Sequence, residues 1–482
     1  MRYAAIQRVL GAIVGLSSLF ALPPLLLALL WNEHDAAQAF GESLLVAGAI
    51  GLLMWWPVRR VNYELRLRDG FFVTTASWVV AGLVCALPFM LTAPHLSYAD
   101  AVFEAVSGLT TTGATVIIGI EHLPDSLKLY RASLNFWGGM GIVILAIAIL
   151  PMLRIGGMQL FRAEATGPTK DRLTPRIAET AKALWRVYLG LGLLCCLAFW
   201  VGGMSFFDAI CHAMATVATG GFGNYDASFG HWDSAELDWI ASVFMLLGGV
   251  NFGLHFLAWK RATMGVYRGD SELRAFLRIT AVVAAVIALT LWWNDVFDSP
   301  MDVIRHATFQ TISSITTTGF TTTGFSHWPG FTALVLVLIS FVGGCSGSTA
   351  GGMKVTRVVM VVRQGLREVS QLVHPKGQFL VKMGGRRISE SVVLSVSGFC
   401  SLYVLSFVLL TLVLTATGLD PTSAFSAVVA CMNNLGPGLG AVAAHFQDVS
   451  DIGIWTCSFA MILGRLEVFT VFVLLTPRFW RE

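Results

Sequence analysis

The sequence predicts an all-α protein that crosses a membrane many times, and its composition and its apolar pattern both support this class. Hydrophobic residues make up 55% of the 482 residues, charged residues only 13%, and the mean hydropathy is +0.71. Soluble domains carry about 25% charged residues, so this chain has too few charges to cover a soluble surface of its size. Apolar runs of about 20 residues, the length that crosses a bilayer as a helix, recur along the chain. A soluble enzyme, a coiled coil and a disordered chain are therefore excluded.

Ten apolar runs are candidate membrane spans. In chain order they are residues 9–31, 40–57, 71–92, 128–152, 184–201, 237–258, 276–293, 330–343, 391–416 and 454–475. The first is expected to be a membrane helix kinked at Pro23 and Pro24, because it is too long for the apolar part of a signal peptide. The eighth is short and runs into a glycine-rich segment, so its limits stay open.

The distribution of basic residues predicts the orientation of these spans. All but four of the 32 Lys and Arg residues lie before the first span, in alternate loops or after the last span. The four exceptions are Lys128, Arg131, Arg305 and Arg465. Because basic loops stay on the cytoplasmic side, both termini are expected in the cytoplasm. The opposite loops are acidic, which suits either ordinary solvated loops or a surface that concentrates cations.

Four long outer loops share an internal repeat with a period of about 100 residues. Residues 103–113 (FEAVSGLTTTG) align without gaps with residues 309–319 (FQTISSITTTG), and the other two loops carry ATGGFG at 218–223 and NNLGPG at 433–438. Each motif follows a helix-start signal, which is Ser97, Ser205, Ser299 or Asp420. The motif glycine comes 16 residues after this signal in three units and 20 residues after it in the third. The third short helix is therefore expected to be one turn longer.

Each repeat is predicted to be a span, a short helix that re-enters the membrane, a glycine turn and a second span. Two leading helices occupy residues 1–66, and the four units occupy residues 67–155, 184–259, 274–363 and 388–476, the third with a broken second helix. Non-helical backbone at membrane depth is tolerated only inside protein or beside water. The four turns are therefore expected to meet around one aqueous axis, a central pore.

The composition of these turns suits a cation filter. Thr and Gly in extended turns aim backbone carbonyls at an ion and replace its hydration shell. Short helices that end at the axis add the negative end of the helix dipole. The candidate filter residues are Thr111, Thr112, Gly113, Gly220, Gly221, Thr318, Gly319, Leu435 and Gly436. Glycines that serve only to pack helices are the alternative.

The motifs resemble those of the Trk/Ktr/HKT superfamily of potassium transporters, most closely the bacterial Trk-type membrane subunit. The resemblance rests on TTTG at 110–113, TGGF at 219–222, TTTGF at 316–320 and NNLGPG at 433–438, and it covers nearly the whole chain. It implies potassium uptake across the bacterial inner membrane, with Gly113 where sodium-passing members have serine. It also implies a homodimer in the lipid bilayer and a cytosolic ring of nucleotide-binding regulatory subunits. No organic cofactor and no nucleic-acid partner are expected of this chain.

A glycine-rich segment and one intramembrane arginine form a candidate gate. Residues 343–354 read GGCSGSTAGGMK, which makes a poor straight helix and does not match a phosphate-binding loop. The resemblance implies an intramembrane loop that gates the filter, and the candidate gate residues are Gly343, Gly344, Gly347, Gly351, Gly352 and Arg465. Arg465 follows its filter glycine by 29 residues and Gly343 follows its own by 24, which predicts a similar depth. Helix packing by the glycines and an Arg465–Glu467 ion pair are the alternatives.

Other functions stay open on the sequence. An ion-coupled secondary transporter would bind its substrate at charges inside helices, for which Arg465 and Glu467 are thin support. A membrane enzyme would need converging His, Glu or Asp residues such as HExxH, a pattern this sequence lacks. His212 and His306 are expected to be packing or pore-rim residues. The basic segment 357–387 is expected to dock a soluble partner, with anchoring to lipid headgroups as the alternative.

Overall fold

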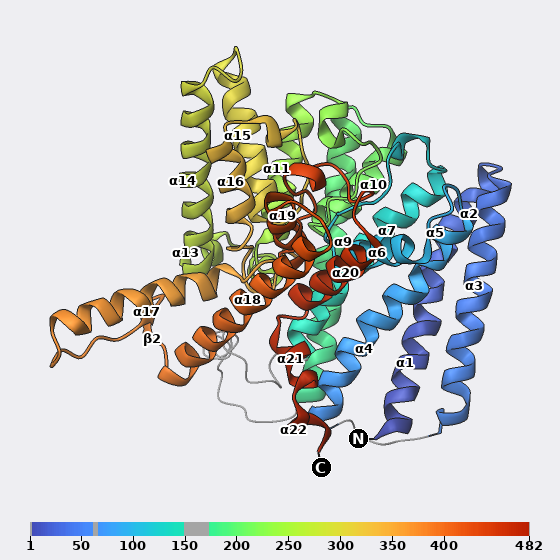
Figure 1. Cartoon of the computed structure of the whole chain (residues 1–482), viewed down its shortest axis with the longest axis horizontal. Coiled ribbons are helices and arrows are strands. Elements are labelled where there is room, and N and C mark those ends of the chain that lie inside the picture. The colour runs from blue at the N-terminus through green and yellow to red at the C-terminus, as the bar shows by residue number, and fades with distance from the viewer. Residues whose placement is uncertain (1, 61–65, 149–172, 482) are drawn as a thin grey trace.

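The computed structural model describes residues 2–60, 66–148 and 173–481, and most of them lie in helices (Figure 1). The helices are α1 (Tyr3–Ser18), α2 (Leu22–Leu30), α3 (His34–Trp55), α4 (Leu67–Cys85), α5 (Leu87–Leu91), α6 (Tyr98–Leu109), α7 (Asp125–Ala148), α9 (Leu173–Val201), α10 (Phe206–Val217), α11 (Ala235–Gly249), α12 (Phe252–Arg261), α13 (Gly265–Gly269), α14 (Ser271–Trp293), α15 (Pro300–Ile315), α16 (Gly330–Ile339), α17 (Val355–Val373), α18 (Glu390–Ala416), α19 (Pro421–Met432), α20 (Asp451–Arg465), α21 (Phe469–Leu475) and α22 (Pro477–Trp480). The predicted polytopic all-helical class is confirmed.

One small hairpin departs from the all-helical prediction. Strands β1 (Lys382–Met383) and β2 (Arg386–Arg387) pair antiparallel after α17. Gly384 and Gly385 join them with φ of 56° and 80°, and two positive φ values in a two-residue turn match the right-handed twist of paired strands.

Six helical stretches of the described chain are long and apolar enough to cross a membrane, and two bent helix pairs raise the number to eight. The described part of the predicted span 128–152 lies in α7, and the end of that span falls outside the described residues. The predicted span 330–343 contains α16, which has only 10 residues. The first predicted span comprises α1 and α2, which are joined by a 3-10 turn at Leu19–Ala21. The turn ends two residues before Pro23, the first of the two prolines.

The two leading spans pack through small residues. A methyl group on Gly51 would lie 2.5 Å from the backbone nitrogen of Gly15, and one on Gly11 would lie 2.7 Å from that of Trp55. Glycines therefore bring the backbones of α1 and α3 together, as is typical of membrane helix pairs. Figure 1 shows this pair at one edge of the molecule, away from the short helices at its centre.

Four short helices, α6, α10, α15 and α19, begin at the predicted caps. Ser97 and Ser205 each accept the N–H three residues later, Asp420 accepts that of Ser423, and Ser299 accepts that of Met301. The carboxylates of Asp100 and Asp208 accept the hydroxyls of their cap serines, at 2.8 and 2.7 Å. Helix α15 has 16 residues and the other three have 12, which confirms the extra turn predicted for the third unit.

Two further predicted spans, residues 237–258 and 454–475, are sharply bent, a feature that was predicted only for the third unit. Helices α11 and α12 meet at 96°, and α20 and α21 meet at 114°. The first bend follows from Asn251, whose side chain accepts the N–H of Gly253 at 2.7 Å and so starts a new helix. At the second bend, Glu467 and Val468 both have positive φ, which an α-helix cannot contain.

Candidate ion-conducting site

The four turns after the short helices share one backbone shape. The residue two before each motif glycine has a positive φ, which is 52° at Thr111, 51° at Thr219, 54° at Thr317 and 57° at Asn434. The glycines are also positive, at 81° for Gly113, 76° for Gly221, 84° for Gly319 and 98° for Gly436. The residue between these two does not have a positive φ in any unit. Four different sequences therefore reach the same alternating conformation, which three L residues in a row would rarely adopt.

Each turn is attached to the end of its short helix in the same way. The N–H of the residue before each glycine donates to the carbonyl five residues earlier, at 2.8 to 2.9 Å. The four bonds run from Thr112 to Ser107, from Gly220 to Ala215, from Thr318 to Ser313 and from Leu435 to Ala430. Such bonds satisfy carbonyls that a helix end leaves free. All four helices consequently present their C-terminal, partially negative ends to the turns.

The four turns contact one another in a closed ring. A methyl group on Gly113 would lie 2.5 Å from the carbonyl oxygen of Gly220, and one on Gly436 would lie 2.7 Å from that of Thr112. A methyl group on Gly221 or Gly319 would overlap the next unit even more closely, at the carbonyl oxygens of Thr318 and Leu435. Each glycine thus meets the residue before the glycine of the following unit, in the order one, two, three, four and back to one. All nine candidate filter residues lie in these four turns.

Hydroxyl side chains brace the turns from outside the ring. Ser107 and Ser313 donate to the carbonyls of Ala114 and Phe320, one residue beyond each glycine, at 2.6 and 2.7 Å. The Thr110 and Thr112 hydroxyls lie 2.7 Å apart, and Thr316 and Thr318 repeat this at 2.8 Å. These contacts recur in units one and three, the two that align without gaps.

Other glycines serve the packing role that was the alternative for the filter glycines. Methyl groups on Gly138 and Gly464 would overlap the carbonyl oxygens of Leu109 and Met432, at the ends of α6 and α19. One on Gly248 would lie 3.1 Å from the carbonyl oxygen of Val217, at the end of α10. These glycines let the second helix of a unit pass close to the end of its short helix.

The glycine-rich loop between α16 and α17 lies against the ends of three short helices. The Gly352 N–H donates to the carbonyl of Asn433 at 3.1 Å, and the Gly351 N–H donates to the hydroxyl of Thr317 at 2.6 Å. The Thr349 hydroxyl donates to Val217 at 3.1 Å and lies 3.2 Å from the hydroxyl of Thr219. The loop therefore contacts the residues that lead into the second, third and fourth turns.

Glycine is required at several positions of this loop. Gly343, Gly347 and Gly352 have φ of 68°, 77° and 70°. Methyl groups on Gly344 and Gly351 would press on the carbonyls of Gly249 and Asn433. The predicted break in the helix is confirmed, since α16 ends at Ile339 and α17 begins at Val355.

Arg465 is buried, with 3% of its surface exposed, and it reaches this loop. Its Nη1 donates to the carbonyl of Thr349 at 2.8 Å, while its Nε and Nη2 find no acceptor among the described residues. The predicted similar depth of Arg465 and the loop is therefore confirmed. The alternative Arg465–Glu467 pair is wrong: Glu467 pairs with Arg357 at 2.5 Å, because the bend after Leu466 turns its side chain toward α17.

Several residues of this region were not singled out from the sequence. Lys354 donates to the Ala350 carbonyl, and Arg465 donates to the neighbouring Thr349 carbonyl. Two positively charged side chains therefore bind successive carbonyls of the loop. Arg357 lies over the ring of Phe399 at 4.3 Å as well as against Glu467. The position of Lys354 two residues after the last glycine of the run was the one signal available, whereas the Arg357–Glu467 pair joins residues 110 positions apart.

Comparison with known proteins agrees with this arrangement. A model of the TrkH family, described as cation transport protein, matches residues 36–481. The chain is 49% identical over 488 residues to the Trk system potassium uptake protein TrkH of Vibrio parahaemolyticus, and 46% identical over 484 residues to that of Escherichia coli K12; each alignment covers 100% of both proteins. Its identity to TrkG of the same E. coli strain is 39%, over 98% of this chain and 97% of TrkG.

A solved structure matches over the full length as well. The crystal structure of the potassium transporter TrkH from V. parahaemolyticus superposes with a TM-score of 0.93 at 47% sequence identity, and the match covers 100% of both chains. A transporter of this family is not an enzyme, so the membrane-enzyme hypothesis is excluded. The chain belongs to the TrkH family of cation transport proteins.

Proposed function

We propose that this chain carries potassium ions into the cell across the bacterial inner membrane, through a filter of backbone carbonyls where the four turns meet. The filter residues are Thr111, Thr112, Gly113, Gly220, Gly221, Thr318, Gly319, Leu435 and Gly436. The observation that carries this proposal is the closed ring in which each motif glycine meets a carbonyl of the next unit. The relatives are named as potassium uptake proteins, which favours potassium as the ion.

A ring of this kind suits a monovalent cation that has lost its water. Carbonyl oxygens replace the hydration shell, and they must hold the ion weakly enough to release it. The ring residues carry no charged side chain, and the ends of four helices supply only partial negative charge. The chemistry therefore favours rapid passage of potassium over tight binding of a divalent metal.

The glycine-rich loop, together with Arg465 of α20, is proposed as the gate beneath this filter. The gate residues are Gly343, Gly344, Gly347, Gly351, Gly352 and Arg465. The loop contacts three of the four units near their turns, and the guanidinium of Arg465 places a buried positive charge beside it. A desolvated positive charge near the ion path opposes a cation, because the interior screens it poorly.

Ion flux into liposomes that contain the purified protein tests the filter and its ion-coupled alternative. We expect rubidium uptake, driven by its own gradient, to exceed sodium uptake by at least about tenfold, the effect of about 1.4 kcal/mol of selectivity. A pH or sodium gradient should not change the final distribution of rubidium. If rubidium accumulates only when such a gradient is imposed, ion-coupled transport replaces the channel. If sodium and rubidium pass equally, the filter proposal is wrong.

The orientation and the assembly are also proposals. Both chain ends lie at the same end of the molecule in Figure 1, which supports placing both termini in the cytoplasm. Helix α17 extends away from the body and exposes Val362, Leu366 and Val369, an apolar stripe at helical spacing. A second copy of the chain that covers this stripe would give the homodimer.

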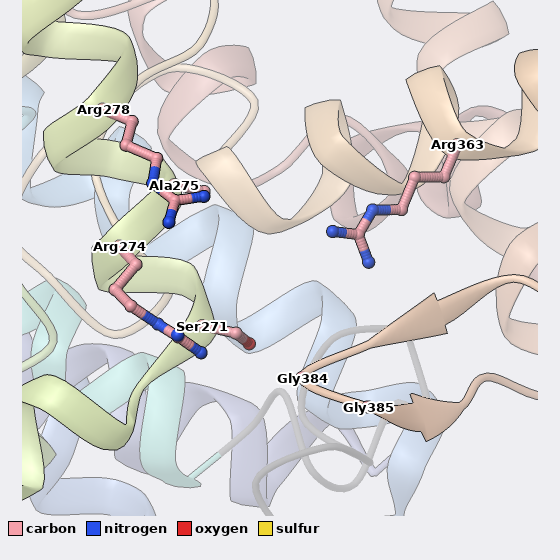
Figure 2. A pocket seen from close by; sticks show the side chains of 7 residues that line it. All are labelled: Ser271, Arg274, Ala275, Arg278, Arg363, Gly384 and Gly385. Atoms are coloured by element: carbon pink, nitrogen blue, oxygen red, sulfur yellow. The ribbon is translucent and has the colours of Figure 1, made fainter.

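The cytoplasmic partner is proposed to be a ring of nucleotide-binding regulatory subunits that docks on the basic inner loops. Part of this surface is a cavity of about 270 Å³ lined by Ser271, Arg274, Ala275, Arg278, Arg363, Gly384 and Gly385. Figure 2 shows Arg274 and Arg278 reaching from α14 and Arg363 reaching from α17 toward the glycine turn of the hairpin. Among the described residues, none that lines the cavity is acidic, so the cavity suits an acidic group of a partner.

Neutralising this cavity is expected to weaken docking. The double variant Arg274→Gln and Arg278→Gln should bind the regulatory ring about thirtyfold more weakly, since two basic contacts of about 1 kcal/mol each amount to about 2 kcal/mol. The matched control is Lys260→Gln with Arg261→Gln, an exposed basic pair at the end of α12 outside the cavity. Binding would be measured on the protein in lipid nanodiscs. Unchanged binding in the cavity variant would favour the lipid-anchoring alternative.

A further inference from the structure

A buried ion pair lies behind the first turn. Glu104 of α6 and Arg131 of α7 are 0% and 1% exposed, and the Arg131 Nε lies 3.5 Å from the Glu104 Oε2. Burying two charges is costly, and such pairs persist only where further hydrogen bonds satisfy them. The partners of these two side chains therefore indicate what the pair holds in place.

Glu104 holds the backbone just beyond the first turn. Its Oε1 accepts the N–H of Val116 at 2.8 Å and also accepts the hydroxyl of Thr115. These residues follow Gly113 by two and three positions. The carboxylate thus fixes the chain where it leaves the ring.

Arg131 extends this contact to the second unit. Its Nη2 donates to the Thr115 hydroxyl at 3.3 Å, and its Nη1 donates to the carbonyl of Gly223 at 3.0 Å. Its guanidinium also lies 4.2 Å from the centre of the Phe222 ring. Thr115 and Gly223 hold equivalent positions, each two residues after the motif glycine of its unit. One side chain therefore bridges the same point of two adjacent turns.

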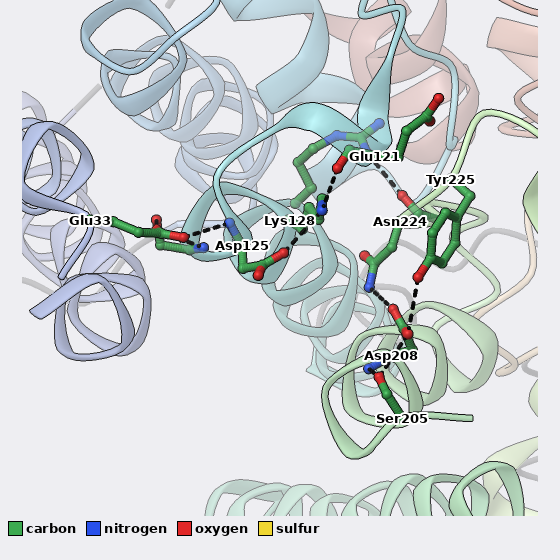
Figure 3. A network of polar contacts seen from close by, with 11 residues as sticks. Glu33, Glu121, Asp125, Lys128, Ser205, Asp208, Asn224 and Tyr225 are labelled. Atoms are coloured by element: carbon green, nitrogen blue, oxygen red, sulfur yellow. Dashed lines mark hydrogen bonds and ion pairs between the residues drawn. The ribbon is translucent and has the colours of Figure 1, made fainter. Parts of the chain in front are cut away.

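A separate set of polar contacts lies nearby, around the first turns of α7 and α10. Figure 3 shows Lys128 between Asp125 and the Glu121 carbonyl, at 3.0 and 2.9 Å, and Asp208 accepting from Asn224 at 2.8 Å. Those contacts join loop residues to helix starts. The Glu104–Arg131 pair reaches inward to the two residues that follow the ring.

The other units have no carboxylate at this place. Nine residues before the motif glycine, where unit one has Glu104, the other units have His212, Gln310 and Ala427. His212 contacts the carbonyl of Asp208 within its own helix, and Gln310 donates to the carbonyl of Thr323 in its own unit. The buried ion pair therefore makes the seam between units one and two chemically different.

We propose that Glu104 and Arg131 are positioning residues that set the ion preference of the filter at this seam. This inference rests on the filter proposed above. A carbonyl that accepts from a guanidinium is a poorer ligand for a cation. Because Arg131 occupies the Gly223 carbonyl, Gly223 marks the end of the row of carbonyls in unit two that are free to bind an ion. Glu104 neutralises Arg131, so the charge does not repel the ion.

The test compares ion preference with stability. In liposomes, Glu104→Gln and Arg131→Lys should each lower the ratio of rubidium to sodium flux about tenfold, the effect of losing one charged hydrogen bond. Asp125→Asn is the control, because it removes the carboxylate that pairs with Lys128 on the same helix as Arg131, makes no contact with Glu104 or Arg131, and should leave the ratio unchanged. Thr115→Val, which removes the hydroxyl shared by both residues and keeps both charges, should lower the ratio in the same direction.

Two results would overturn the inference or separate it from the filter proposal. If the Glu104, Arg131 and Thr115 variants lower the unfolding temperature but keep the wild-type flux ratio, the pair is only structural. Gly113→Ser is measured in parallel. A changed ratio in Gly113→Ser with unchanged ratios in the pair variants overturns the positioning role alone, whereas unchanged ratios in all of them overturn the filter itself.

Discussion

Replacing Gly113 by serine is expected to admit sodium and to lower the rubidium-to-sodium flux ratio by about tenfold or more. Gly113 has φ of 81°, which a residue with a side chain rarely adopts, and a Cβ there would lie 2.5 Å from the Gly220 carbonyl oxygen. The turn must shift, and the carbonyls of the proposed filter shift with it. Flux of both ions into liposomes measures the ratio.

The same geometry ranks the four glycines. Gly221 and Gly319 are closer to the carbonyls of the next unit than Gly113 and Gly436 are, so serine at those two positions should abolish flux rather than relax selectivity. Gly203→Ala is the control, because Gly203 has φ of 106° but no atom near its Cβ position. It carries backbone strain without touching the ring. Wild-type selectivity in Gly113→Ser would show that the turns do not select the ion.

Replacing Arg465 by alanine is expected to raise flux in the absence of any partner by roughly tenfold, without a change in ion preference. Two unit charges about 8 Å apart at an effective dielectric constant of about 20 repel each other by about 2 kcal/mol, enough for such a change. The variant also frees the Thr349 carbonyl and so loosens the loop. Rubidium uptake into liposomes that contain only this chain is the measurement.

Arg465→Lys is the matched variant, since it keeps the positive charge and loses the forked donor. It should stay close to the wild-type flux. If Arg465→Ala conducts no faster than wild type while folded and dimeric, Arg465 is structural and the gate lies elsewhere. An increase in sodium flux alone would instead place Arg465 in the filter.

The sequence predicted the turns well because local chemistry determines them. A cap such as Ser97, a fixed distance to Gly113 and a need for positive φ are all encoded within 17 consecutive residues. The longer third helix could be predicted from the same spacing. The break at residues 343–352 was equally visible, because a run of glycines disfavours a helix on its own.

Contacts between distant units could not be predicted in this way. Nothing in the sequence near Glu467 indicates that its partner is Arg357, and the positive φ of Val468 is unusual for a β-branched residue. Arg131 was visible only as a basic residue outside the cytoplasmic loops, and its contact with Gly223 spans 92 positions. The bend after Gly249 depends on Asn251 starting a new helix, and a single asparagine in an apolar run is a weak local signal.

The ring of four turns is built from a single polypeptide, and this affects how the pore responds to mutation. In a pore made of four identical subunits, one codon change alters every quarter of the ring at once. Here each quarter has its own codons, so a change at Gly113 leaves Gly221, Gly319 and Gly436 intact. The ring can therefore vary one quarter at a time, with a charged seam at Glu104 and Arg131, a glycine-rich loop in the third unit and a buried arginine in the fourth. A substitution in one unit therefore changes the proposed filter by one quarter and leaves the other three quarters as they were.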